Sequence, residues 1–312
     1  MDKSIKISIV SPVYRAEALV DALVETIIEE VSKITPDFEI ILVEDCGPDN
    51  SWDKIKENCA KYPVLKGIKL SRNFGQQHAM QAGMDASVGE FIITMDCDLQ
   101  DHPTEIIKLY NKALEGFDIV QASRTNRQDD FLKKMSSVLF NRLLSYLSET
   151  KQDPTVANFV LYRRVALEAI AEVNDYRRYY PMLIQWVGFK RAKVEIEHRE
   201  RDTGGSSYSY KKRIVLAIDT ILTFSDKPLR MAVKFGVFTT FIAIVATVVM
   251  LAIYMRGSIA VPGWTSLALL ITFFSGVIIL ILGVVGMYVG KTFESVKARP
   301  TYIIREQKNF ND

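Results

Sequence analysis

The N-terminal part of the chain alternates between short apolar runs and longer amphipathic segments. Each apolar run has the length of a buried strand, and each amphipathic segment repeats its apolar residues at the three- and four-residue spacing of a helix. The pattern predicts strands over 5–11, 39–44, 64–70, 91–94 and 119–122, and helices over 17–32, 52–60, 76–86 and 103–114. Strands that alternate with helices of this length predict an α/β fold, in which helices cover both faces of a parallel sheet.

Two long apolar runs near the C-terminus have a different pattern. The run over 235–255 has about 21 residues without a charge, and the run over 264–290 has about 27. A helix needs about 20 apolar residues to cross the hydrocarbon core of a bilayer, so both runs are predicted to be transmembrane helices. Lys and Arg flank the outer ends of the pair, and the connector over 256–263 is short. The positive-inside rule therefore predicts a hairpin with both ends in the cytoplasm.

Two further segments have amphipathic spacing. The segment 208–230 begins with basic residues and repeats apolar residues until Pro228, as in a helix that lies at the membrane surface. The segment 131–147 fits a helix that covers a site or touches the membrane, and it fits an ordinary surface helix equally well. The predicted organisation is a cytoplasmic α/β domain over 1–207, juxtamembrane helices over 208–232, two transmembrane helices within 233–290, and a cytoplasmic tail over 291–312.

Composition adds little to this picture. The 312 residues are 48% hydrophobic with a net charge of +2, so no global charge favours nucleic acid as a partner. The three cysteines are odd in number and lack a Cys-x-x-Cys spacing, so we expect reduced thiols without a disulfide framework or a zinc site. The apolar run after Lys3 is too short for a signal peptide, and we therefore expect the N-terminal part to stay in the cytoplasm.

Polar side chains follow nearly every predicted strand. In chain order they are Tyr14, Asp45, Arg72, Asn73, Asp96, Asp98 and Arg124. The carboxyl ends of parallel strands meet at one edge of a sheet, where open α/β sheets bind ligands. Asp96 and Asp98 stand one residue apart and offer hard oxygen atoms that suit Mg²⁺ or Mn²⁺ bound to a diphosphate. An isolated Asp-x-Asp is as often a turn rich in Asp, so the pair alone leaves both interpretations open.

A second group of polar residues lies in the segment 199–208. It combines two arginines with glycines and hydroxyl side chains, which is the chemistry that binds a phosphate. The three histidines of the chain lack the spacing of metal ligands, and a surface or capping role is expected for each.

These motifs, taken together, resemble those of family 2 glycosyltransferases with the GT-A fold. The motifs in order are Ser11-Pro12-Val13-Tyr14, Val43-Glu44-Asp45, Arg72-Asn73-Phe74-Gly75, Met95-Asp96-Cys97-Asp98-Leu99-Gln100, Ser123-Arg124 and the Arg199–Tyr208 loop. The resemblance covers essentially the whole chain. It is closer to the polyprenyl-phosphate glycosyltransferases, which include dolichol-phosphate mannose synthases and the bacterial bactoprenol glucosyltransferases.

The resemblance implies a Rossmann-like, mostly parallel sheet and a role for each matching residue. The nucleotide-sugar would be bound by Pro12, Tyr14, Glu17, Asp45, Arg72, Asn73, Asp96 and Asp98. The cation, Mg²⁺ or Mn²⁺, would be held by Asp96, Asp98 and Gln100. Acceptor and phosphate groups would be bound by Arg124, Arg127, Arg199, Arg201, Ser206 and Ser207. The implied catalytic residues are Asp96, Asp98, Arg124 and Asp153, where Asp153 is a candidate base or acceptor-orienting group or, equally, a cap before Pro154.

The chain departs from the family pattern at two turns. The family usually has Pro-Val-Tyr-Asn-Glu-Glu where this chain has Arg15, Ala16 and Glu17 after Tyr14. The usual Asp-Asp-Gly-Ser turn is replaced by Glu44, Asp45, Cys46 and Gly47. Both departures lie in the implied nucleoside pocket, so the base of the donor stays open.

The resulting hypothesis is a metal-dependent, inverting transfer of a sugar from a nucleotide-sugar to polyprenyl (undecaprenyl) phosphate. The implied donor is a UDP-sugar, with glucose as the first candidate, and the implied use is cell-envelope glycan modification. The location would be the cytoplasmic face of the bacterial inner membrane, in a multi-pass protein with both termini in the cytoplasm. A homo-oligomer such as a tetramer is the assembly that would be looked for first. Two alternatives are a processive polysaccharide synthase, whose Gln-x-x-Arg-Trp motif is absent, and a non-catalytic, membrane-tethered nucleotide-sugar-binding protein.

Overall fold

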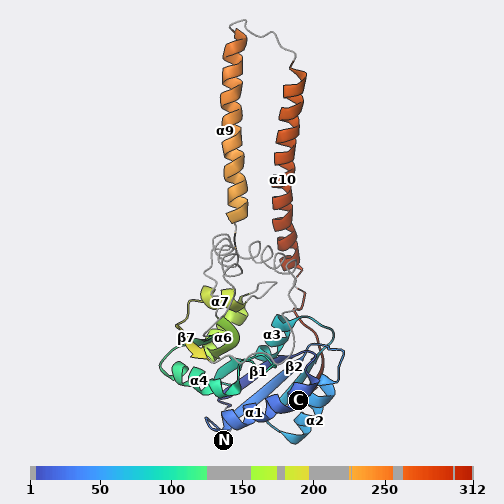
Figure 1. Ribbon diagram of the computed structural model, residues 1–312, viewed down its shortest axis with the longest axis vertical. Helices are drawn as coiled ribbons and strands as arrows, with labels where there is room; N and C mark the ends of the chain where they lie inside the picture. The colour runs from blue at the N-terminus through green and yellow to red at the C-terminus, as the bar shows by residue number, and fades with distance from the viewer. Residues whose placement is uncertain are drawn as a thin grey trace, which may run out of the picture. The chain divides into compact units, whose positions relative to one another are not determined.

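The computed structural model describes residues 5–124, 156–173, 180–196, 225, 227–255, 263–297 and 299–310 (Figure 1). The chain divides into two units, which are considered separately below. The first contains the sheet and includes the C-terminal segment from Arg299 onward, and the second contains the two long helices near the C-terminus.

The first unit is built on an eight-stranded sheet with the order β7-β5-β6-β4-β1-β2-β3-β8. Its strands are β1 (Ile7–Val13), β2 (Phe38–Glu44), β3 (Leu65–Leu70), β4 (Phe91–Thr94), β5 (Ile119–Arg124), β6 (Val156–Arg163), β7 (Arg191–Ile196) and β8 (Ile304–Lys308). Strands β4, β1, β2 and β3 are parallel neighbours. Every residue of β1, β2 and β4 is buried, as expected for strands covered on both faces.

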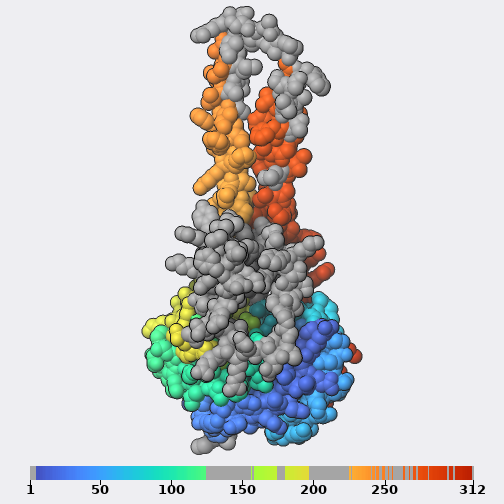
Figure 2. All heavy atoms as spheres, viewed as in Figure 1, coloured from blue at the N-terminus to red at the C-terminus, as the bar shows by residue number. Residues whose placement is uncertain are grey.

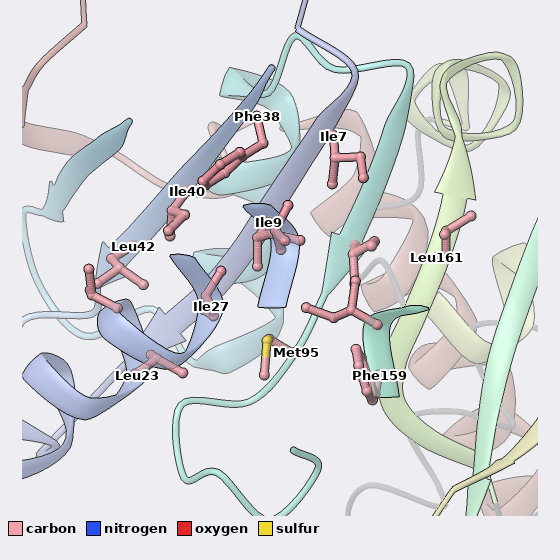
Figure 3. Close-up of a cluster of buried hydrophobic side chains, with 14 of the residues drawn as sticks. Ile7, Ile9, Leu23, Ile27, Phe38, Ile40, Leu42, Met95, Phe159 and Leu161 are labelled. Atoms are coloured by element: carbon pink, nitrogen blue, oxygen red, sulfur yellow. The ribbon is translucent and has the colours of Figure 1, made fainter. Parts of the chain in front are cut away.

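Helices cover both faces of this sheet. They are α1 (Val20–Ser32), α2 (Ser51–Lys61), α3 (Gln76–Ala86), α4 (Ile106–Leu114), α6 (Arg164–Glu172) and α7 (Tyr180–Trp186), with 3-10 turns η1 (Glu17–Leu19) and η2 (Pro103–Glu105) ahead of α1 and α4. Side chains of α1, α2 and α4 pack in one apolar cluster, part of which is shown in Figure 3. Side chains of α3, α6 and α7 pack in the other. Gly83 lets α3 approach the sheet closely, because a Cβ at this position would clash with Val10 of β1.

The predicted α/β fold is confirmed, and the strand and helix boundaries agree closely with the sequence pattern through β5. The mostly parallel sheet that the resemblance implied is also confirmed, and the apolar pattern did not show which strands are antiparallel. Strand β6 lies between β4 and β5 and is antiparallel to both, whereas β5 pairs in parallel with β7. An apolar strand has the same local pattern in either direction, so the pattern did not reveal this insertion.

The last strand of the sheet, β8, lies within the segment predicted to be a cytoplasmic tail. It pairs antiparallel with β3, from Gly67 opposite Lys308 to Leu70 opposite Ile304. Polar contacts also hold this segment: Trp52 Nε1 donates to Glu306 Oε2 at 3.0 Å, and Asn309 Nδ2 donates to the carbonyl oxygens of Cys59 and Leu65, each at 2.8 Å. All five residues of β8 are exposed, so the strand has no hydrophobic pattern from which it could be predicted.

The second unit contains α9 (Lys227–Met255) and α10 (Trp264–Val296), which run side by side (orange and red in Figures 1 and 2). Both predicted apolar runs are therefore helical. Among the described residues, one segment, Phe273–Phe293 of α10, is long and apolar enough to cross a membrane. The predicted helix over 131–147 and the predicted interfacial helix up to residue 224 lie outside the described residues.

Candidate active site

Several of the predicted site residues meet at the carboxyl edge of the parallel strands. Val13, the last residue of β1, is opposite Glu44, the last residue of β2, and Val10 is opposite Thr94, the last residue of β4. The ladders continue one step further, because Asp45 N donates to Val13 O and Met95 N donates to Val10 O, each at 3.0 Å. This register brings the segments that carry Tyr14, Asp45 and Asp96 together at one edge.

The turns at this edge share an unusual backbone conformation. Arg15, Cys46 and Leu99 have φ angles of 54°, 51° and 56°, and they follow β1, β2 and β4. Left-handed backbone is unfavourable for residues with a Cβ, and such strain is concentrated at functional sites. At Leu99 the turn is held by Asp98, whose Oδ1 accepts from Gln100 N at 3.2 Å. The shared conformation marks this edge as the candidate site independently of the motifs.

The left-handed conformation occurs at two positions where the chain departs from the family pattern noted above. Arg15 stands where relatives usually have Asn, and Cys46 stands where they usually have Gly. Asn and Gly are the two residues that adopt positive φ most readily. The chain therefore keeps the turn geometry that suits those residues, although it carries side chains that disfavour it.

Replacing Cys46 by Gly should raise the free energy of unfolding by about 1 kcal/mol, because the left-handed backbone no longer carries a Cβ. The shift should be visible as a higher thermal midpoint of the purified protein. Cys59→Gly is the contrasting variant, since Cys59 is buried within α2 and Gly is unfavourable in a helix. A lower midpoint for Cys46→Gly would contradict the assignment of strain to this turn.

Asp45 is buried, with 3% of its surface exposed. Its two carboxylate oxygens accept from the backbone of the Arg72–Gly75 motif, from Phe74 N at 2.7 Å and from Gly75 N at 2.8 Å. Burial raises the pKa of Asp45, and the two N–H groups oppose that rise because they stabilise the carboxylate. The end of β2 is thereby fastened to the segment that leads into α3.

Asp96 is held by two carboxamide groups. Gln76 Nε2, on the first residue of α3, donates to Asp96 Oδ1 at 2.6 Å. Asn158 Nδ2, in β6, donates to Asp96 Oδ2 at 3.4 Å. The sequence pattern gave neither residue a role, although Gln76 directly follows the Arg72–Gly75 motif. That both would reach Asp96 depends on the placement of α3 and β6, which the pattern does not reveal.

The turn after β1 is joined to the turn after β2. Glu17 N donates to Asp49 Oδ2 at 3.1 Å, and Asn50 N donates to Glu17 Oε2 at 3.2 Å. Tyr14 is 43% exposed at this edge, with the Arg15 guanidinium 5.4 Å from its ring centroid. Pro12, the residue before Val13 in β1, is buried.

Arg72 and Asn73 are exposed beside the same edge. The Arg72 guanidinium lies 3.9 Å from the ring centroid of Phe74, and its Nη1 donates to Asn73 O at 3.1 Å. Arg124 ends β5. The remaining predicted residues, Arg127, Asp153, Arg199, Arg201, Ser206 and Ser207, lie outside the described residues.

The predicted cation site was Asp96, Asp98 and Gln100. Among the residues that the structure describes, no group of three or more His, Cys, Asp or Glu side chains could hold a metal ion. Two carboxylates and a carboxamide nevertheless supply hard oxygen atoms, and Mg²⁺ is often bound through one or two carboxylates together with substrate phosphates. These three side chains thus suit a cation that is bound together with a diphosphate. They suit less well a cation that the protein alone would hold.

Comparison with known proteins agrees with this geometry. Residues 8–171 match the family model described as glycosyl transferase family 2. Over 98% of this chain and 95% of the relative, the chain is 34% identical to the Bacillus subtilis protein named uncharacterized glycosyltransferase YkcC. It is 32% identical to the undecaprenyl-phosphate 4-deoxy-4-formamido-L-arabinose transferase of Proteus mirabilis, over 98% of this chain and 94% of the relative.

A solved structure resembles the fold. The glucosyl-3-phosphoglycerate synthase of Mycobacterium tuberculosis, crystallised with Mn²⁺, UDP and phosphoglyceric acid, has a TM-score of 0.52 and 15% sequence identity, covering 70% of this chain and 76% of that chain. The sheet order, the acids at its carboxyl edge and the full-length relatives agree with the family match. The chain is a glycosyltransferase that belongs to glycosyl transferase family 2, with a GT-A-like α/β fold.

Proposed function

We propose that this glycosyltransferase moves a sugar from a nucleotide-sugar to polyprenyl phosphate, in a cation-dependent and inverting reaction at the cytoplasmic face of the membrane. The observation that carries the proposal is the carboxyl edge of the sheet, where Asp96 and Asp98 follow β4 beside the turns after β1 and β2. Relatives that match the chain over nearly its full length are named for transfer to undecaprenyl phosphate.

The leaving diphosphate needs the strongest stabilisation in such a reaction. Asp96, Asp98 and Gln100 would hold a divalent cation, which supplies a positive charge opposite the charge that develops on the diphosphate. The side chains themselves orient this edge: Asp45 fixes the Phe74–Gly75 backbone, and Asp98 fixes its own turn through Gln100 N. Arg124, Arg127, Arg199 and Arg201 are proposed to bind the phosphate groups of donor and acceptor.

The acceptor phosphate needs little deprotonation by a general base before it reacts. A phosphate monoester has its second pKa near 6, so it is mostly dianionic at neutral pH and is ready to attack. Asp153 is proposed to orient the acceptor phosphate or to take the proton from the minor monoanionic form of the acceptor. A single displacement by the phosphate oxygen would invert the configuration at the anomeric carbon.

The pairing of β8 supports a hairpin in the membrane. Strands β7 and β8 belong to one sheet, and the chain between them contains both α9 and α10. A sheet lies on one side of a bilayer, so the chain between these strands must cross an even number of times. If Phe273–Phe293 of α10 crosses, α9 is the described helix that would make the return crossing.

The direct test uses the purified full-length protein with undecaprenyl phosphate, Mn²⁺ or Mg²⁺, and a panel of labelled UDP- and GDP-sugars that begins with UDP-glucose. We expect one labelled sugar on each lipid phosphate, with loss of product when EDTA removes the cation. Donor binding without turnover across the whole panel would instead identify a non-catalytic binding protein. A labelled polymer would identify a processive synthase.

A further inference from the structure

We propose that Gln76 and Asn158 are positioning residues for Asp96, which hold its carboxylate in the orientation that binds the cation and diphosphate. The inference rests on the proposed function, because it takes Asp96 to be a cation ligand. It assigns a task to two residues that the family motifs leave without one.

The two carboxamides approach Asp96 from different parts of the fold. Gln76 reaches Oδ1 at 2.6 Å from the N-terminal end of α3, and Asn158 reaches Oδ2 at 3.4 Å from β6. A carboxylate with a hydrogen-bond donor on each of its two oxygens is held against rotation about its last side-chain bond. The shorter contact makes Gln76 the principal donor of the two.

The chemical type of these donors matters as much as their position. A carboxamide N–H is neutral, so it orients the carboxylate without cancelling the negative charge. Lys or Arg at the same place would also donate, but either would form an ion pair that competes with the incoming cation. Carboxylates that bind a metal ion are themselves held by hydrogen bonds from such outer partners.

The fold holds both carboxamides in place. Gln76 directly follows Phe74 and Gly75, whose N–H groups are bound by the buried carboxylate of Asp45. On the other side, Thr94 Oγ1, two residues before Asp96, donates to Asn158 O at 3.1 Å. The segment that leads into Gln76 is therefore held by Asp45 at the end of β2. The backbone of Asn158 is held by Thr94, the last residue of β4.

The side chain of Gln76 is exposed, so the effect of replacing it on cation binding can be distinguished from an effect on core packing. An exposed side chain on the first residue of a helix contributes little to the core. Its replacement should therefore leave stability nearly unchanged and act on cation binding. Gln307→Leu is a matched control, because it makes the same chemical change at an exposed position of β8.

The test measures Mn²⁺ binding to the full-length protein in detergent, by the electron paramagnetic resonance signal of free Mn²⁺, with UDP and separately with GDP. We expect Gln76→Leu to weaken Mn²⁺ binding by about 10- to 100-fold, the range for loss of an outer partner at a metal site. Asn158→Leu should have a smaller effect, and Gln76→Lys a larger effect than Gln76→Leu. Gln307→Leu should bind as the wild type, and thermal midpoints should verify that the variants are folded.

A kinetic measurement separates orientation from a structural defect. Excess Mn²⁺ should restore sugar transfer by Gln76→Leu, because the ligand is present but poorly held, whereas it should not restore Asp96→Ala. If Asp96→Ala loses Mn²⁺ binding and Gln76→Leu binds as the wild type, the positioning role is refuted and the proposed function stands. If the wild type binds no Mn²⁺ with either nucleotide, or Asp96→Ala binds normally, the cation site itself is refuted.

Discussion

Asp98→Asn should lower the rate of sugar transfer by about 10³-fold, with little change in the fold. The substitution removes one negative charge from the proposed cation site and keeps the shape of the side chain. An Asn oxygen can still accept from Gln100 N, the contact that Asp98 Oδ1 makes at 3.2 Å, so the strained turn at Leu99 should persist. The loss should therefore appear in the chemistry and in cation affinity, and not in the thermal midpoint.

The measurement is the initial rate of lipid-linked product at saturating donor and acceptor, over a range of Mn²⁺ concentrations. Asp53→Asn is the matched control, because Asp53 lies on the exposed surface of α2 and pairs with Lys56 at 2.6 Å. This control should transfer sugar as the wild type does. An Asp98→Asn protein that keeps more than a tenth of wild-type activity would mean that the reaction does not depend on this carboxylate.

Removing residues 299–312 should destabilise the sheet by about 5 kcal/mol and lower the thermal midpoint by on the order of 10 °C. The truncation removes β8 and leaves the edge of β3 without its partner. It also leaves several polar groups without the partners described above, among them Trp52 Nε1 and the carbonyl oxygens of Cys59 and Leu65. An exposed strand edge of this kind promotes aggregation.

Single substitutions can report the same effect if the truncated protein does not fold. Asn309→Ala removes both side-chain hydrogen bonds at 2.8 Å and places Ala at a φ of 59°, so we expect a loss of about 2–3 kcal/mol. Gln307→Ala, at an exposed position of β8, should cost much less. If the truncated protein and the Asn309→Ala variant both have the thermal midpoint of the wild type, β8 contributes nothing to the stability of the sheet.

The sequence predicted the elements well where burial leaves an apolar pattern in the residues. Helix α3 and strand β4 have the bounds that the apolar pattern indicated, because the buried face of α3 imposes a helical period and the fully buried β4 is a short continuous run of mostly apolar residues. The insertion of β6 and the addition of β8 could not be predicted in this way. Both depend on pairing between residues far apart in the chain, and β8 has no buried residue to impose a period.

The residues of the candidate site also fall into those that the sequence pattern could reveal and those that depend on long-range packing. Asp45, Asp96 and Asp98 could be located from the sequence, because each is an acid in the segment that follows the end of a predicted strand. The carboxamides of Gln76 and Asn158 could not, because each reaches Asp96 only through the packing of α3 and β6 on the sheet. The positive φ angles of Arg15 and Cys46 were also hidden, since neither residue type favours that conformation.

Strand β8 has a consequence for the order in which the protein is made. The ribosome releases the chain from its N-terminus, and domains generally begin to fold during synthesis. Strand β8, the edge strand next to β3, leaves the ribosome only after both long helices have been synthesised. While the two helices are being synthesised, the outer edge of β3 therefore has no strand to pair with. A chain that stops before Ile304 would lack this strand, and the open edge of β3 would favour aggregation.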